Sequence, residues 1–239
     1  MATPYNLDVQ HSCSECVMRA ERPFCDMSPQ AVAALDSLKF TSVYPKGALL
    51  FVEGEQARGV FVLCSGRAKL STTSTDGRTV IVKIAEAGEI LGASATILGN
   101  SHEVSAETLE PSQLNFVRGA DFLRLLRSHG EASLNVARQL SEKYQSAHRE
   151  IRSLGLSRTV AEKLAKLLLN WCTQHGEQTS LGVRLKVLLT HEEIAQMVGS
   201  TRETITRLLS DFRLHKIIEV KGSTMLVTQK NDLERMVSI

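Results

Sequence analysis

A series of short β-rich runs occupies residues 40 to 118, and turn or charged residues separate them. Evenly spaced runs of this kind are typical of a β-sandwich or a small β-barrel. Asp76-Gly77, which lies between two of the runs, is a typical hairpin turn. We therefore expect an antiparallel β domain here. The runs are TSVYP, ALLFVEG, GVFVLCSG, RAKLSTTST, RTVIVKIAEAG, HEVSAETLE and SQLNFVRG.

Helices are expected on both sides of the β-rich segment. Residues 28–38, SPQAVAALDSL, begin with a serine that can cap a helix, followed by a proline suited to its first position. From about residue 121 the apolar period becomes helical. Apolar or small residues then recur at alternating spacings of three and four, the heptad pattern of paired helices. Packing on the β domain is the alternative, but we prefer self-pairing into a symmetric dimer. The stripe consists of Ala137, Leu140, Tyr144, Ala147, Ile151 and Leu154.

Two short helices joined by a tight turn are expected near the C-terminus. Thr190 and Glu193 have the spacing of a capping box, which begins the first helix. Gly199 ends that helix, and Ser200 can cap the next one. Two β runs around residues 221–223 follow. Helix, turn, helix and hairpin in this order predict a winged helix-turn-helix.

Polar residues gather on one face at the start of the second helix. Arg202, Glu203, Thr206 and Arg207 share that face, from which helices of this motif contact DNA bases. The alternative is structural: Glu203 completes a capping box or forms an i,i+4 ion pair with Arg207. Three further candidates for DNA contacts lie at the helix ends, and these are Thr190, Ser200 and Thr201.

The charge of the chain is divided unevenly along its length. Residues 1–150 hold 15 Lys+Arg and 17 Asp+Glu, a net charge of −2, whereas residues 151–239 hold 13 and 9, a net charge of +4. A basic C-terminal part agrees with a nucleic-acid partner for the predicted winged motif.

The order of these elements resembles that of the CRP/FNR family of bacterial transcription regulators. Segments that carry the resemblance are YPKGALLFVEGE, GVFVLCSGRAKLST, DGRTVIVKIAEAGEILG and LTHEEIAQMVGSTRETITRLLSDF. The resemblance covers about residues 30 to 235 and implies an α+β fold. Its expected parts are a Cys-bearing arm (1–27), a jelly-roll, cyclic-nucleotide-binding-like sensor barrel (28–120), a dimerisation helix (121–155) and a winged helix-turn-helix domain (156–239).

The family resemblance also implies a DNA target and partners. RETITR matches the family's recognition-helix pattern, so Arg202, Glu203 and Arg207 are expected in the major groove. Arginine suits the O6/N7 edge of guanine, and glutamate accepts from cytosine N4. Members with these residues favour TGTGA-type half-sites. The resemblance therefore implies a homodimer on a TGTGA…TCACA-like palindrome in double-stranded DNA, with RNA polymerase as a further partner.

The barrel segment lacks the residues with which family members bind cyclic AMP. Ala93 follows Gly92 where those members have a ribose-binding glutamate, and His102-Glu103 replace the phosphate-binding Arg-Ser pair. A carboxylate repels a phosphate, and the bidentate arginine is missing. We therefore expect no binding of cyclic AMP, while another ligand or none remains open.

The N-terminal arm carries three clustered cysteines. Cys13, Cys16 and Cys25 follow His11, and C-x2-C is the compact half of many metal sites. The FNR branch holds an iron–sulfur cluster at a similar trio and a fourth cysteine in the barrel. Here the third spacing is longer, and QLNFVR, where the fourth is expected, has no cysteine. An iron–sulfur cluster or zinc, a reactive thiol switch and a purely structural arm are the alternatives.

The remaining two cysteines are expected to be core residues, Cys64 as a small buried hydrophobe of a barrel strand and Cys172 within a helix. Because the chain has no export signal, we expect free thiols or metal ligands, not disulfides, in a cytoplasmic protein with no membrane span.

Enzymatic function finds no support in the motifs. G-x-S-x-G, H-E-x-x-H, a P-loop and G-x-G-x-x-G are all missing, and His102 is the only histidine of the β region. A non-enzymatic, DNA-binding regulator is therefore expected. The alternatives are a cyclic-nucleotide-responsive regulator and a cyclic-nucleotide-like binding module without DNA binding.

Overall fold

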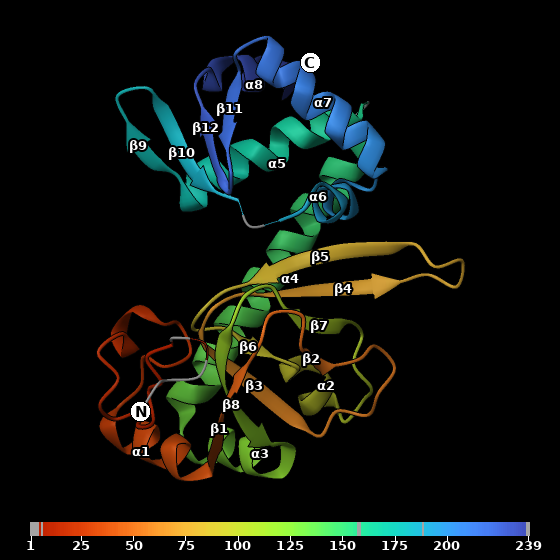
Figure 1. Cartoon of the computed structure of the whole chain (residues 1–239). Coiled ribbons are helices and arrows are strands. Elements are labelled where there is room, and N and C mark those ends of the chain that lie inside the picture. Colours follow the sequence, from red (N-terminus) through yellow and green to blue (C-terminus); the bar gives the residue numbers. More distant parts are fainter. Residues whose placement is uncertain (1–4, 6, 157–158, 188, 238–239) are drawn as a thin grey trace. The chain divides into compact units, whose positions relative to one another are not determined.

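The chain divides into two compact units, Met1–Gln145 and Ser146–Ile239 (Figure 1). The computed structural model describes residue 5 and residues 7–156, 159–187 and 189–237. Each unit has its own hydrophobic core. The helices that begin in the first unit are η2 (Arg19–Glu21), α1 (Pro29–Leu38), α2 (Ala93–Leu98), α3 (Gly119–Ser128) and α4 (Gly130–Leu156).

The N-terminal unit is built on a sandwich of two antiparallel four-stranded sheets, with strand orders β1-β8-β3-β6 and β2-β7-β4-β5. Leu63, Leu70, Ala106 and Leu114 belong to the core cluster that both sheets supply. The expected sandwich-type β domain is confirmed. Its strands are β1 (Lys39–Tyr44), β2 (Leu49–Phe51), β3 (Gly59–Ser65), β4 (Ala68–Thr73), β5 (Thr79–Ala85), β6 (Ile90–Leu91), β7 (Ser105–Thr108) and β8 (Ser112–Arg118).

Local sequence chemistry explains two of the expected elements. Ser28 caps α1 by accepting a hydrogen bond from the Ala31 backbone N–H, and Pro29 occupies the first helical position. Gly77 has φ +85° at the hairpin that joins β4 and β5, a conformation glycine adopts without strain. The short strand β6 and the helix α2 were not expected from the sequence.

Strand β3 presents two different faces to the core. Val60 and Val62 belong to the cluster that includes the arm, α1 and α3, whereas Leu63 belongs to the cluster between the sheets. This is the two-residue alternation of a strand with both faces covered. The pairing with β8 shifts register between Leu63 and Ser65, so a bulge lies at Cys64.

The segment from 121 to 155, expected to hold one dimerisation helix, comprises most of α3 and of α4. The LGLS segment (154–157) suggests a hinge from its sequence, but Gly155 lies inside α4, and Ser157 lies outside the described residues. Tyr144 and Ile151 expose 68% and 67% of their surface in this single chain. Ala137 and Ala147 are also exposed, Leu140 is half-buried, and the Leu154 side chain is outside the described set.

The opposite face of α4 is fastened to the N-terminal unit. Asn135 and Gln139 are buried polar residues on that face. Gln139 accepts from the Ile90 backbone N–H at 2.9 Å, and the Lys143 ammonium donates to the Ile90 carbonyl at 3.2 Å. Helix α4 is therefore bonded to strand β6 through the backbone N–H and the carbonyl of Ile90.

The C-terminal unit surrounds one core with helices and a four-stranded sheet of order β11-β12-β10-β9. Leu168, Ile194, Ile205 and Phe212 are among its buried residues. Among the described residues, no helix combines the length and the hydropathy that a membrane span requires. The elements are α5 (Val160–His175), β9 (Glu177–Thr179), β10 (Gly182–Lys186), α6 (His191–Val198), α7 (Arg202–Leu214), β11 (Ile218–Lys221), β12 (Thr224–Val227) and α8 (Lys230–Val237).

Candidate nucleic-acid interface and cysteine pocket

Helices α6 and α7 form the predicted helix-turn-helix. Thr190 and Glu193 make a capping box at the start of α6, as expected. Gly199 ends the helix in the left-handed conformation, with φ +67°. The cap of α7 is Thr201, whose side chain accepts from the Thr204 N–H, and not Ser200. The Ser200 N–H instead donates to the Ala195 carbonyl, which completes the end of α6.

Three charged side chains of the predicted face are exposed at the N-terminal end of α7. Arg202, Glu203 and Arg207 all lie on the surface, while Ile205 and Leu209 face the core. Within the described chain the structure records no hydrogen bond or ion pair for the three charged side chains, including the alternative Glu203–Arg207 pair. The N-terminal end of α7 therefore presents three charged side chains that a binding partner can contact.

The threonines of the predicted interface have partners within the protein. The Thr206 hydroxyl lies 2.9 Å from His191 Nδ1, so it connects α7 to α6. The Thr190 hydroxyl donates to Glu193 at 3.0 Å as well as capping α6. Thr201 is likewise a cap. Thr206 therefore connects the two helices, and Thr190 and Thr201 cap α6 and α7. Contact with DNA stays a prediction for all three.

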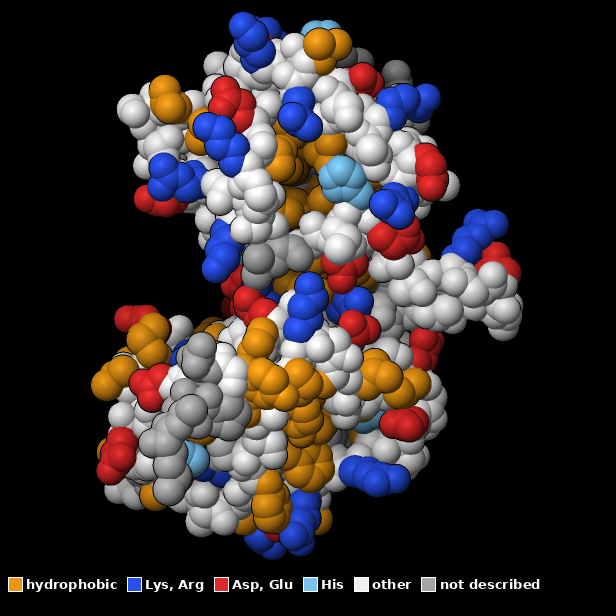
Figure 2. Space-filling model, in the orientation of Figure 1, with side chains coloured by type: hydrophobic (Ala, Val, Ile, Leu, Met, Phe, Trp, Pro, Cys, Tyr) orange, Lys and Arg blue, Asp and Glu red, His pale blue; other side chains and the backbone are white. Residues whose placement is uncertain are grey.

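The expected wing is the hairpin of β11 and β12. The strands pair antiparallel from Ile218–Val227 to Lys221–Thr224, and Gly222 turns between them with φ +58°. Lys221 is exposed at the tip. Figure 2 shows Lys and Arg side chains spread over the visible face of the C-terminal unit, in keeping with the net charge of this part of the sequence.

Two of the predicted effector residues of the barrel, Ala93 and His102, are buried. The His102 ring stacks on Phe51 with ring centroids 3.9 Å apart, and burial lowers the pKa of His102. A Cβ on Gly92 would lie 3.0 Å from the His102 ring, and Ala93 is buried. Only Glu103 is exposed. The imidazole therefore lies directly beside Gly92, another of the predicted effector residues.

The N-terminal arm is attached to the first sheet and to α1 by backbone contacts. The Cys13 N–H donates to Asp36 at 2.8 Å, and the Gln10 N–H donates to Gln113 at 2.8 Å. The Gln113 amide returns a bond to the Gln10 carbonyl at 2.7 Å. These bonds hold the backbone of the arm in place at Cys13, where the cysteine motif begins.

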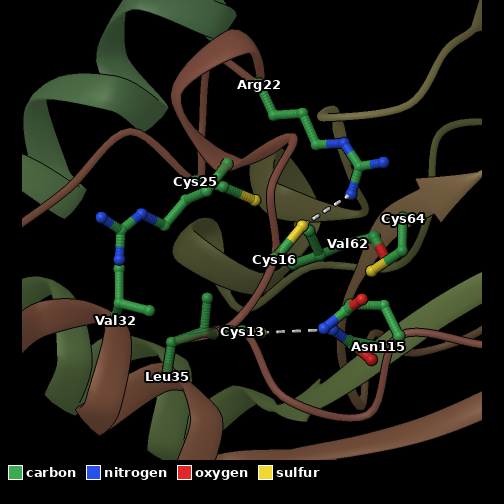
Figure 3. Close-up of a pocket in the computed structure, with 11 residues that line it drawn as sticks. Cys13, Cys16, Arg22, Cys25, Val32, Leu35, Val62, Cys64 and Asn115 are labelled. Carbon is green, nitrogen blue, oxygen red and sulfur yellow. Dashed lines mark hydrogen bonds between the residues drawn. The ribbon is translucent and has the colours of Figure 1, made fainter. Parts of the chain in front are cut away.

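Four cysteines line one small pocket between the arm and strand β3 (Figure 3). They are Cys13, Cys16 and Cys25 of the arm and Cys64 of β3. In Figure 3 the sulfurs of Cys16, Cys25 and Cys64 point into the space between the two segments. None of the sulfurs is in a disulfide. Among the described residues, no group of three or more His, Cys, Asp or Glu side chains is placed to hold a metal ion.

Polar and cationic groups surround these sulfurs. The Arg22 guanidinium donates to Cys16 Sγ at 3.6 Å, and the Asn115 amide donates to Cys13 Sγ at 3.7 Å. Arg19 also lines the pocket. Burial raises the pKa of the Cys13 thiol to about 11 and the pKa values of Cys25 and Cys64 to about 12. Without a partner these buried thiols are protonated and weakly nucleophilic at neutral pH.

Cys64 is buried, as expected. It shares the arm-facing side of β3 with Val60 and Val62, and its side chain lines the cysteine pocket. The strand alternation could have indicated this face, but the sequence does not show that the arm covers it. His11 is exposed. Lys39 donates a hydrogen bond to the backbone carbonyl of His11 and not to its ring. Cys172 is in the core of the other unit.

Comparison with known proteins agrees with this architecture. The family described as "Cyclic nucleotide-binding domain" matches residues 41–129, and the family described as "Crp-like helix-turn-helix domain" matches residues 162–236. The chain belongs to the CRP/FNR family. A CRP-like cAMP-activated global transcriptional regulator of Mycobacterium tuberculosis is 28% identical over 89% of this chain and 94% of its own length. A global nitrogen regulator of Nostoc is 27% identical over 80% of this chain and 86% of its own length.

Solved structures of other proteins share the fold. CooA of Carboxydothermus hydrogenoformans superposes with a TM-score of 0.74 at 24% identity, covering 86% of this chain and 90% of its own. FixK2 of Bradyrhizobium japonicum superposes with a TM-score of 0.72 at 19% identity, covering 83% of this chain and 96% of its own. The cyclic-nucleotide-binding-like fold is thus shared, whichever ligand each protein binds.

Proposed function

We propose that the protein is a homodimeric transcription regulator that binds a palindromic DNA site through α7. The observation that carries the proposal is the exposed group of Arg202, Glu203 and Arg207 at the N-terminal end of that helix, with no partner for any of the three in the described chain. Arginine and glutamate in this position suit guanine and cytosine edges in the major groove. The half-site that the family pattern implies is TGTGA.

The exposed stripe on α4 supports the proposed dimerisation. Tyr144 and Ile151 are large apolar side chains with more than half of their surface in contact with water. A second copy would bury them in a two-fold symmetric helix pair. That symmetry would place two recognition helices about 34 Å apart, one turn of DNA. At the promoter, RNA polymerase is the partner through which such a dimer would act.

The regulatory input is assigned to the N-terminal unit. His102 fills the space beside Gly92, and Ala93 supplies no carboxylate for a ribose, so cyclic AMP is not the proposed effector. A signal at the cysteine arm would instead act by shifting the population of dimer conformations. A cyclic-nucleotide-responsive regulator remains the second candidate, favoured by the domain match over residues 41–129.

The test is fluorescence anisotropy of the wild-type protein at fixed salt, with a TGTGA…TCACA duplex and a scrambled duplex of equal composition. Specific regulators bind their sites about 10³-fold or more tightly than other DNA, and we expect a preference of that order. Addition of cyclic AMP should change neither affinity. Equal affinity for the two duplexes would refute sequence-specific binding, and a large increase with cyclic AMP would favour the second candidate.

A further inference from the structure

We propose that His191 is a positioning residue for DNA recognition, which acts by holding the Thr206 side chain on the recognition face of α7. The inference rests on the proposed function and deepens it, because it adds a residue outside α7 that determines base preference. His191 begins α6 and lies 15 residues before Thr206 in the chain. Neither the capping box nor the R-E-T-x-x-R pattern specifies a histidine at this position.

The central observation is the hydrogen bond between the two side chains. His191 Nδ1 lies 2.9 Å from the Thr206 hydroxyl, within the usual range for such a bond. Both residues are exposed, so this polar contact lies on the surface of the unit and not in its core. Thr206 follows Arg202 by four residues and Glu203 by three, and it therefore shares their face of α7. The bond thus attaches α6 to the face that is proposed to contact bases.

The backbone around His191 is held by its neighbours. The Thr190 hydroxyl accepts from the Glu193 N–H at 3.2 Å, and the Thr190 N–H donates to the Glu193 carboxylate at 2.8 Å. Ile194 of α6 and Ile205 of α7 both belong to the buried core of the unit. The core therefore sets the distance between the two helices, and the ring of His191 spans the remaining gap on the surface.

A threonine on a helix surface needs such a partner to present one orientation. Its χ1 angle divides between two rotamers, because the hydroxyl can bond a backbone carbonyl one turn back. Serine and threonine hydroxyls also bond either donors or acceptors of base edges, so an unrestrained threonine distinguishes bases poorly. The bond to His191 engages the Thr206 hydroxyl and, by holding χ1, also sets the direction of the Thr206 methyl group. One fixed pattern is then presented to the major groove.

A second histidine of the helix pair provides a matched control. His215 follows the last residue of α7, and it is exposed like His191. Its Nδ1 lies 2.8 Å from the Asp211 backbone carbonyl of the same helix. The two imidazoles therefore differ in what they contact, because only His191 bonds a side chain of the recognition face.

The test is a double-mutant cycle for DNA binding by the full-length protein. The variants are His191→Ala, Thr206→Val and the two combined. His191→Asn is the conservative replacement, since an asparagine amide lies close to the place of Nδ1, and His215→Ala is the control. Fluorescence anisotropy at one salt concentration gives the affinity for two duplexes. One is the sequence that the wild type selects from a random library, and the other is a scrambled duplex of equal composition.

Both single variants should weaken binding to the selected duplex by about 3- to 10-fold, the effect of one lost hydrogen bond. The double variant should bind no more weakly than the weaker single variant, because His191 acts through Thr206. Binding to the scrambled duplex, and binding by His191→Asn and His215→Ala, should change by less than about twofold. On duplexes that carry each alternative base pair, His191→Ala and Thr206→Val should lose preference at the same position of the half-site.

Three results would overturn the proposal. Additive losses in the double variant would show that His191 acts independently of Thr206. An equal loss on both duplexes for His191→Ala would mean that the ring contacts phosphate. Unchanged base preference in Thr206→Val at every position would remove the group that His191 is proposed to hold, whatever the behaviour of the other variants. Circular dichroism checks the folding of each protein.

Urea unfolding of the same variants separates positioning from a structural role. Coupling between the two substitutions in the free energy of unfolding, without coupling in DNA preference, would make the bond structural only and would also overturn the proposal.

Failure of this inference differs from failure of the proposed function. If the wild type selects an inverted repeat and the losses in the cycle are additive, only the role of His191 is overturned. If the wild type selects no sequence from the library, the proposed DNA function is overturned, and the inference that rests on it is overturned with it.

Discussion

The Asn135 side-chain amide donates to the Asp26 carbonyl at 2.8 Å and to the Phe24 carbonyl at 3.4 Å, so it holds both neighbours of Cys25. Asn135 is buried on α4, the helix that also carries the exposed apolar stripe. A movement of Cys25 would act directly on these bonds. This gives a physical link between the cysteine pocket and the proposed dimer helix.

Asn135→Ala should destabilise the N-terminal unit by about 1–3 kcal/mol, because backbone carbonyls of the arm lose their buried donor. Urea unfolding followed by circular dichroism measures the change. The control is Gln145→Ala, an exposed position on the same helix, for which we expect a change within about 0.5 kcal/mol. Equal stability of the two variants would show that the Asn135 contacts contribute little.

Arg207→Ala should weaken binding to the cognate palindrome by about 1–3 kcal/mol and weaken binding to random duplex much less, because a base contact is lost. Lys221→Ala, at the exposed wing tip, should instead weaken binding to both duplexes alike, as expected for a phosphate contact. Anisotropy titrations at one salt concentration compare the two variants. An equal loss on both duplexes for Arg207→Ala would mean that this residue only contacts phosphate.

Tyr144→Glu should convert the dimer to a monomer, because it introduces a charge into the apolar stripe that pairs two copies of α4. Sedimentation velocity measures the change. Gln145→Glu is the matched control, since it adds the same charge at the next residue, outside the stripe. A dimer that survives Tyr144→Glu, or a wild-type protein that is monomeric, would place the interface elsewhere or remove it.

His102→Phe should reduce the loss of stability in mild acid. Burial lowers the pKa of His102 below its usual 6.5, so only the unfolded chain takes up the proton as the pH falls through that value. The contribution of neutral His102 to the free energy of unfolding is thus complete above pH 6.5. It declines as the pH falls, until the pH has passed below the folded-state pKa. Phenylalanine keeps a ring beside Phe51 without a proton site.

Urea unfolding of the wild type and of His102→Phe, at about pH 7.5 and about pH 5.5, checks this. The variant should lose less free energy of unfolding than the wild type between the two conditions. Parallel losses in the two proteins would indicate that His102 titrates in the folded protein as it does in the unfolded chain.

Local patterns predicted the parts of the fold that local chemistry determines. The capping box of Thr190 and Glu193, the end of α6 at Gly199 and the wing turn at Gly222 all depend on neighbours within a few residues. The choice between Ser200 and Thr201 as the cap of α7 was wrong by one position, because both hydroxyl residues suit the role and only the backbone of the turn decides between them.

Tertiary contacts determined what the sequence could not predict. Cys64 faces the arm because residues 13–25 cover that side of β3, and no pattern within either segment specifies this contact. The stacking of His102 on Phe51 similarly joins two strand regions. The Thr206 hydroxyl lies 2.9 Å from His191 Nδ1 across the helix pair, a contact that no local pattern indicates, and its contact with DNA stays a prediction.

Binding-site selection from a random duplex library tests the central claim most directly, since it assumes no target. The purified dimer is expected to enrich inverted TGTGA-type half-sites whose centres are about one helical turn apart. Arg207→Ala, selected in parallel, should lose the preference at one position of each half-site. A different half-site core, or sequences enriched without inverted symmetry, would contradict the account of how α7 recognises DNA.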